Sequence, residues 1–205
     1  MQHRSSLCLR FAFLPAALLL FATVLPAQEQ ESAISHYNAG VRKYRAGDLP
    51  GAIISLNRAI ELNPEYWKAL TSRGVAKKDS GDLEGALRDH SRSIEINPKN
   101  AAAYSNRGTV YHDLQKLDAA LADYSTALSL DPADWYVYNN RGVVKVDKEQ
   151  LADAIADFNK AIELKADYAE AWFNRGVARR RTGDEAGGNA DKARAAELDP
   201  RFKGR

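Results

Sequence analysis

Five glycines recur at intervals of 34 residues along almost the whole of this 205-residue chain: Gly40, Gly74, Gly108, Gly142 and Gly176. A repeat of this length accommodates two short helices and the turns that join them. One such pair of helices cannot bury its apolar face alone, so successive pairs must stack on one another. The spacing therefore predicts a row of stacked helix pairs, whose curved wall offers a surface for holding another molecule.

Each repeat also carries small and apolar residues at fixed distances from its glycine. Alanine follows the first four glycines by twelve residues, at Ala52, Ala86, Ala120 and Ala154. Small residues let two helix axes approach closely, so these positions are expected to be helix contacts. The apolar residues of each second half recur every three or four positions, as they do in an amphipathic helix. Each repeat is therefore expected to be two amphipathic helices.

Turn residues divide the helices. Gly47-Asp48, Gly81-Asp82 and Gly183-Asp184 each supply a residue that tolerates positive φ and then an acid that can cap the next helix. Proline ends four of the second helices, because the residue before proline is driven out of helical geometry. Gln115 and Glu149 replace the turn glycine in two units, and Ala166 replaces a proline. We expect those turns to be looser or differently shaped.

The N-terminus has the three parts of a secretory signal peptide. Arg4 and Arg10 precede an apolar run at residues 11–25, and the polar segment begins after Ala27. We predict a signal peptide at residues 1–27, cleavage after Ala27, and a periplasmic or secreted protein. The alternative is a membrane anchor through residues 11–25, but a span needs about 20 apolar residues and Pro15 interrupts this shorter run.

Composition of the mature chain excludes several classes of protein. The single cysteine, Cys8, lies in the leader, so no disulfide is expected and packing alone must stabilise the fold. Loss of Arg4 and Arg10 reduces the 29 basic residues to 27, equal to the 27 acidic ones. A chain with no net charge gives no electrostatic case for binding nucleic acid or an anionic membrane.

The repeats resemble the tetratricopeptide-repeat family, in the secreted or periplasmic bacterial type whose first helices carry Asn-Arg-Gly. That tripeptide is complete at residues 106–108, 140–142 and 174–176. The resemblance covers residues 35–200 and implies an all-α, right-handed α-solenoid of five helix-turn-helix repeats. We place the repeats at about 33–66, 67–100, 101–134, 135–168 and 169–200, after a linker or helix start at 28–34 and before a tail at 201–205.

The residue just before each recurring glycine varies together with the residue fifteen positions after that glycine. Four units have arginine and aspartate at these places: Arg73 with Asp89, Arg107 with Asp123, Arg141 with Asp157, and Arg175 with Asp191. The first unit lacks both charges and has Ala39 and Ser55. We expect a structural ion pair between the two helices of each of the four units. Binding of an anionic ligand by these arginines is the alternative.

The resemblance implies that the first helices line a concave face, with the residues that flank the glycine directed into it. Amide or hydroxyl side chains stand two residues before each glycine: Asn38, Ser72, Asn106, Asn140 and Asn174. An amide donates and accepts at once, so this ladder could bind the backbone of an extended peptide. Tyr37, Tyr136 and Phe173 lie beside it. The alternative is that each amide bonds to a neighbouring helix.

No catalytic or metal-binding pattern stands out. His36, His90 and His112 occupy different places in their units, so no regular spacing brings two rings to one metal. His90 is in register with Leu56, Tyr124 and Phe158, and we expect it to be packed in the core. We predict no enzyme activity, no cofactor and no nucleic-acid partner. A membrane is a partner only if the leader stays uncleaved.

These features favour an adaptor that binds a protein or peptide partner on its concave face. A self-associating structural protein, such as a homodimer, is one alternative, and a subunit that positions substrate for an envelope enzyme is another. Gly188 and Lys192 interrupt the apolar pattern of the last helix. We interpret that helix as a polar cap on the stack, or as an open end that pairs with another copy.

Overall fold

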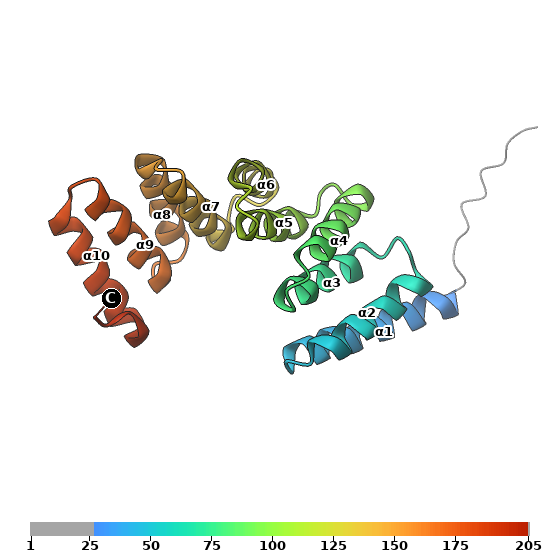
Figure 1. The fold of residues 1–205 in the computed structure, drawn as a ribbon. Helices are drawn as coiled ribbons and strands as arrows, with labels where there is room; N and C mark the ends of the chain where they lie inside the picture. Colours follow the sequence, from blue (N-terminus) through green and yellow to red (C-terminus); the bar gives the residue numbers. More distant parts are fainter. Residues whose placement is uncertain (1–26, 205) are drawn as a thin grey trace, which may run out of the picture.

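The computed structural model describes residues 27–204, in which ten α-helices form five successive pairs and no strand occurs (Figure 1). The first helices of the pairs are α1 (Ala27–Arg45), α3 (Trp67–Asp79), α5 (Ala101–Asp113), α7 (Trp135–Asp147) and α9 (Ala169–Arg181). The second helices are α2 (Leu49–Leu62), α4 (Leu83–Ile96), α6 (Leu117–Leu130), α8 (Leu151–Leu164) and α10 (Glu185–Leu198). The chain is an all-α solenoid of helix-turn-helix repeats.

The pairs follow one another in a curved row from α1 and α2 to α9 and α10 (Figure 1). Each helix contacts the next one along the chain, and each first helix also contacts the first helix of the following pair. Successive second helices are spread further apart. The first helices therefore lie on the inner side of the curve.

Each recurring glycine lies where a side chain of the second helix crosses the first helix. A Cβ atom added to Gly74 would lie 2.6 Å from Cε1 of His90, and one added to Gly142 would lie 2.6 Å from Cε1 of Phe158. Carbon atoms that are not bonded to each other do not approach so closely. The 34-residue period thus marks helix crossings that leave no room for a side chain on the first helix.

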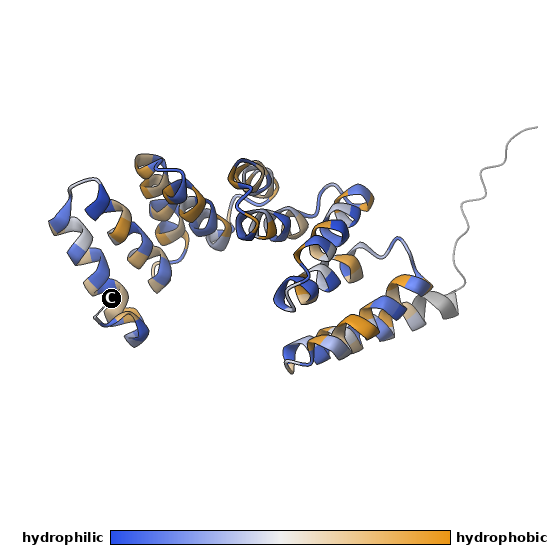
Figure 2. Ribbon diagram, in the orientation of Figure 1, coloured by the Kyte–Doolittle hydropathy of each residue, from blue (hydrophilic) through white to orange (hydrophobic). Residues whose placement is uncertain are grey.

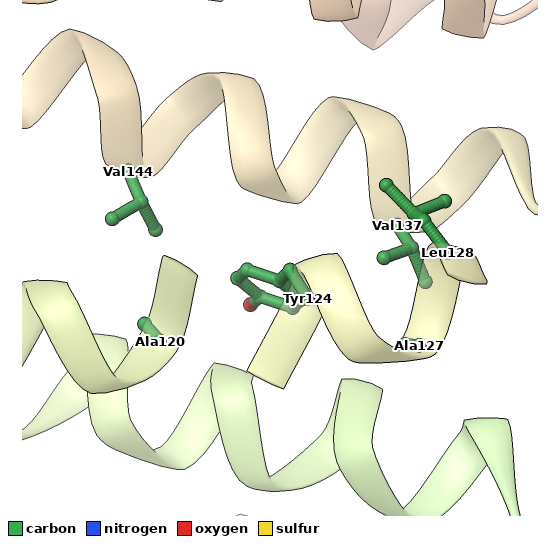
Figure 3. Packing of buried hydrophobic residues seen from close by; sticks show 6 residues of the cluster. All are labelled: Ala120, Tyr124, Ala127, Leu128, Val137 and Val144. Atoms are coloured by element: carbon green, nitrogen blue, oxygen red, sulfur yellow. The ribbon is translucent and has the colours of Figure 1, made fainter. Parts of the chain in front are cut away.

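Apolar faces of neighbouring pairs meet in a series of small cores rather than in one large one. The cluster between α6 and α7 consists of Ala120, Tyr124, Ala127, Leu128, Val137 and Val144. In Figure 3 the ring of Tyr124 lies between the two helices, with the alanines on either side of it. Orange and blue segments alternate along the helices in Figure 2, as expected for amphipathic helices.

The turns that lack glycine have the same shape as the turns that contain it. Gln115 and Glu149 have φ angles of 58° and 59°, in the left-handed region that Gly81 occupies with φ of 91°. The N–H of Gln115 donates to the carbonyl of His112 at 2.8 Å, as the N–H of Gly81 does to the carbonyl of Lys78 at 3.0 Å. The expectation of looser turns is wrong, because these backbone bonds fix the turn whatever the side chain.

Loss of the proline also leaves its turn unchanged. Lys165 ends α8 with φ of −144° and ψ of 89°, close to the −131° and 88° of Asn97 before its proline. The aspartate caps do differ between units. Asp82 accepts a hydrogen bond from the N–H of Gly85, whereas Lys116 at the start of α6 makes no side-chain cap. The third unit therefore lacks both the turn glycine and the cap.

A short 3₁₀-helix, η1 (Pro200–Phe202), follows α10 and covers part of the last pair. The ring of Phe202 lies 5.0 Å from that of Phe173, as the ring of Tyr66 lies 5.2 Å from that of Tyr37 in the first pair. Both Phe202 and Tyr66 stand 26 residues after the glycine of their unit. Phe202 thus packs on α9 in the way that the start of a following repeat packs on α1.

Nearly all of the predicted signal peptide lies outside the described residues. Ala27, its expected last residue, is the first residue of α1, and residues 28–34 belong to the same helix. From residue 27 to residue 204, no helix is both long enough and apolar enough to cross a membrane.

Replacing Gln115 with glycine should stabilise the protein. A side chain in the left-handed region costs about 1 kcal/mol, and glycine removes this cost. We expect Gln115→Gly to raise the free energy of unfolding, measured by urea denaturation, by about 1 kcal/mol. The matched change Gly81→Gln should lower it by a similar amount. No difference between the two variants would contradict the proposed strain.

Candidate functional site

Four arginine–aspartate bridges join the two helices of the second to fifth pairs. In every bridge, Nε and Nη2 of the arginine donate to the two oxygens of the carboxylate at 2.6–2.9 Å. The pairs are Arg73–Asp89, Arg107–Asp123, Arg141–Asp157 and Arg175–Asp191. All four aspartates are buried. In the first pair, Ser55 takes the place of the aspartate and accepts a hydrogen bond from Lys43 Nζ at 3.1 Å.

Each of these arginines also reaches back to the preceding pair, a contact that we did not predict from the sequence. Nη1 of Arg73 donates to Asn57 Oδ1 at 2.7 Å, and Nη1 of Arg107 donates to Ser91 Oγ at 3.1 Å. Arg141 and Arg175 make the same bond to Ser125 and Asn159. One guanidinium therefore links three helices. The acceptors all stand seventeen residues after a glycine, and Ala193 stands there in the fifth unit. This pattern is the signal that could have revealed the contact.

A second cation lies against three of the four aspartates. Lys77, Lys145 and Arg179 approach Asp89, Asp157 and Asp191 at 2.9, 2.7 and 3.0 Å. The third unit has Tyr111 at this position.

Asp123 is therefore bridged by Arg107 alone, and the rings of Tyr104 and Tyr111 lie 5.7 and 5.8 Å from that guanidinium. Hydrogen bonds to Asp123 raise the pKa of Arg107, so the guanidinium stays protonated. These bridges pair the buried charges between helices. Other residues therefore line the concave face.

Some side chains of the predicted ladder form hydrogen bonds to other side chains, and the rest do not. Asn174 Nδ2 donates to Asn139 Oδ1 at 3.0 Å, and Asn140 Oδ1 accepts from Asn139 Nδ2 at 3.5 Å. Within residues 27–204, the side chains of Asn38, Ser72 and Asn106 form no hydrogen bond to another residue. The free groups therefore lie on α1, α3 and α5, and those of α7 and α9 are engaged by neighbouring side chains.

The three aromatic residues beside the ladder also differ in their surroundings. Tyr37 and Phe173 pack against the aromatic residue that follows their own pair, Tyr66 and Phe202. Tyr136 is 48% exposed on α7, with its ring 5.9 Å from that of Trp135. Of these three, Tyr136 alone borders the pockets between α1 and α7. Phe173 borders a separate hollow with Asn174 and Arg201.

Two adjoining pockets occupy the inner face between α1 and α7. The larger has a volume of about 300 Å³ and is lined by Val41, Tyr44, Arg45, Leu56, Thr71, Ser72, Val75 and Asn106. The smaller has a volume of about 190 Å³ and is lined by Tyr44, Val75, Lys78, Asp79, His90, Asn106, Thr109 and Tyr136. Tyr44, Val75 and Asn106 belong to both, so the pockets form one groove. We call it the inner groove.

His90 on α4 lines the smaller pocket. Its side chain is fully buried, which confirms its predicted place in the core. Both ring nitrogens nevertheless lack a hydrogen-bond partner. Burial lowers the pKa of His90 to about 4; Asp89 opposes this shift, while Arg107 and Lys78 add to it. The ring is therefore neutral at physiological pH, with one N–H donor and one acceptor nitrogen unused.

Models of two protein families match this chain. The model described as TPR repeat matches residues 74–115, 108–148 and 144–183, and the model described as tetratricopeptide repeat matches residues 37–90. The chain belongs to the tetratricopeptide-repeat family. A search of curated proteins with the sequence found no match.

Several solved structures share the fold of this tetratricopeptide-repeat protein. Residues 41 to the end of MamA from Desulfovibrio magneticus RS-1 align with a TM-score of 0.74 and 21% identity, covering 85% of this chain and 98% of that one. The structure described as a functional characterisation of Pseudomonas aeruginosa pilF aligns with a TM-score of 0.77 and 17% identity, covering 83% and 78%. YrrB, described as a TPR protein with an unusual peptide-binding site, aligns with a TM-score of 0.67 and 20% identity, covering 84% and 89%.

Removing the carboxylate of Asp123 should destabilise the protein more than removing the whole bridge. Asp123→Ala leaves the guanidinium of Arg107 partly buried without its partner, at a cost of about 3–5 kcal/mol. The double variant Arg107→Met, Asp123→Leu leaves no charge unpaired and should lose less stability. Urea denaturation of both variants measures this difference. A double variant less stable than Asp123→Ala would contradict a structural role for the bridge.

Proposed function

We propose that this protein is a non-catalytic adaptor that holds an extended segment of a partner protein in the inner groove. The observation that carries this proposal is the pair of adjoining pockets on α1, α3 and α5, at the place where the ladder side chains are free. Asn106 borders both pockets, and its amide can donate to and accept from a peptide backbone.

The groove is better suited to a peptide than to a small molecule. Its two compartments adjoin each other along successive first helices and differ in the polarity of their walls. Val41, Leu56 and Val75 give the larger compartment apolar walls, whereas polar groups surround the smaller one. Alternating apolar and polar pockets are typical of surfaces that bind extended chains. YrrB, which has the same fold, is itself described as having a peptide-binding site.

A binding role without catalysis agrees with the chemistry of the groove. Among the residues that the structure describes, no three histidine, cysteine, aspartate or glutamate side chains are grouped so as to hold a metal ion. Tyr44 donates to Asp79 at 2.5 Å, and Lys78 pairs with the same carboxylate at 3.1 Å. The ionised groups of the smaller pocket thus neutralise one another, and the ring of His90 forms no hydrogen bond to an acid that would make it a general base.

We place this adaptor in the periplasm or outside the cell, on the strength of the leader pattern at residues 1–27. A helix that begins at Ala27 would leave the folded repeats intact after cleavage there. N-terminal sequencing of the protein from envelope and culture fractions tests this location. An intact N-terminus in a membrane fraction would favour an anchor through residues 11–25 instead.

Site-specific photo-crosslinking tests the position of the binding surface. A photoreactive side chain in place of Ser72 lies in the inner groove, whereas the same group in place of Ser129 lies on the exposed surface of α6. We expect adducts with a partner from position 72 and none from position 129. Adducts from position 129 alone would contradict the proposal.

The Asn106 amide provides the matching loss-of-function test. Removing its hydrogen bonds by Asn106→Ala should weaken partner binding by about 1 kcal/mol, roughly fivefold, and lower the yield of the position-72 adduct accordingly. Asn189→Ala removes an amide on α10, away from the groove, and should leave that yield unchanged.

A further inference from the structure

One end of the inner groove carries a cation that pairs with no acid of the described chain. Arg45 lies in the last turn of α1, is exposed, and borders the larger compartment. From residue 27 to residue 204, its guanidinium forms neither an ion pair nor a side-chain hydrogen bond. The donors of a guanidinium are held in a fork that matches a carboxylate. Arg45 is therefore free to bind an acid that another molecule supplies.

Charged residues stand at the same place in the other four repeats, and most of them are already engaged. The residues five positions after the glycines are Arg45, Asp79, Asp113, Asp147 and Arg181. Three of them bond to a side chain of the preceding repeat: Asp79 to Tyr44, Asp147 to His112, and Arg181 to Glu149. Asp113 has no ion pair among the described residues, but it borders neither pocket. At this position of the repeat, Arg45 alone brings an unpaired charge to the inner groove.

The other charges of the groove neutralise one another. Lys78 and Asp79 are the remaining charged side chains that border the two pockets, and Lys78 Nζ lies 3.1 Å from Asp79 Oδ1. A hydrogen bond to Asp79 raises the pKa of Tyr44 to about 12, so this phenol stays a donor to that carboxylate. The net charge of the groove is therefore positive, and the uncompensated charge lies at the end formed by α1.

This cation stands beside apolar walls. Val41 precedes Arg45 by four residues, so the two side chains lie on one face of α1 with their Cβ atoms about 6 Å apart. Val41, Leu56 and Val75 line the larger compartment, where an aliphatic side chain would bury apolar surface. Side chains on one side of an extended peptide are two residues, or about 7 Å, apart. An apolar residue and an acid at that spacing therefore match the compartment and Arg45.

We propose that the inner groove binds an extended segment in which an apolar residue and an acidic residue are two positions apart, with the apolar side chain in the larger compartment and the carboxylate on Arg45. A basic residue in place of the acid would meet a like charge, and a neutral one would leave Arg45 unpaired. This inference rests on the proposed function of the groove and adds the chemistry of the partner.

Binding of synthetic peptides to the purified protein tests this selectivity. The probes are fluorescent peptides with leucine at one position and glutamate, glutamine or lysine two positions away, made in both orders because the groove admits either chain direction. In at least one order, fluorescence anisotropy at low salt should show about threefold tighter binding of the glutamate peptide than of the glutamine peptide. The lysine peptide should bind about tenfold more weakly than the glutamate peptide, because repulsion replaces attraction. Equal affinities in both orders would overturn the inference and leave groove binding intact.

Reversal of the charge at position 45 provides the matched test. Arg45→Glu should invert the order of affinities, so that the lysine peptide binds more tightly than the glutamate peptide, and its binding also shows that the variant is folded. Arg45→Gln should remove the preference without inverting it. Arg88→Glu makes the same change of charge at an exposed position of α4 that borders neither pocket, and it should keep the preference for glutamate. A preference for glutamate that persists in Arg45→Glu would overturn the proposal.

Failure of the groove and failure of the acidic segment give different results. Absence of adducts from position 72, together with no binding of any peptide, would overturn the proposed function itself. Adducts from position 72, with glutamate peptides that bind no better than lysine peptides or do not bind, would overturn the acidic segment alone.

Discussion

The close crossing of two helices at each recurring glycine is the contact on which this structure depends. Because no side chain fits between Gly74 and the ring of His90, the second helix lies directly against the first. The same crossing recurs in every pair, and small cores of the kind seen in Figure 3 form beside it. The side chain opposite the glycine differs between units: Tyr124 forms a hydrogen bond with Thr109, whereas the ring nitrogens of His90 have no partner. The packing of each pair is therefore set at one position in its repeat.

Ion pairs hold successive crossings in register. Each bridging arginine binds the aspartate of its own pair through two nitrogens and the preceding pair through the third. A planar guanidinium suits this task because its donors are held in a rigid fork. Since these strong donors are consumed between helices, the inner groove is left with amides and hydroxyls, together with the charged side chains of Arg45, Lys78 and Asp79. Such a surface can recognise a peptide by hydrogen bonding as well as by charge.

Much of the fold could be predicted from the sequence, because the repeat supplies five comparisons within one chain. The absence of both Arg and Asp from the first unit indicated which residues belong together. The turn at Gln115 was mispredicted because backbone hydrogen bonds, which a residue pattern does not display, impose the left-handed angle. The division of the ladder was also hidden, since it depends on Asn139, an amide that occurs in one unit alone and engages both Asn140 and Asn174.

The ring nitrogens of His90 offer the most direct measurement of the central claim, which is that the side chain opposite each glycine is packed between the two helices of its pair. Nitrogen-15 NMR distinguishes His90 from His3, His36 and His112, whose signals can be assigned with glutamine substitutions. We expect His90 to stay neutral until the pH falls toward its pKa of about 4, because burial disfavours the charged ring. A His90 that titrates near 6.5 would contradict the claim.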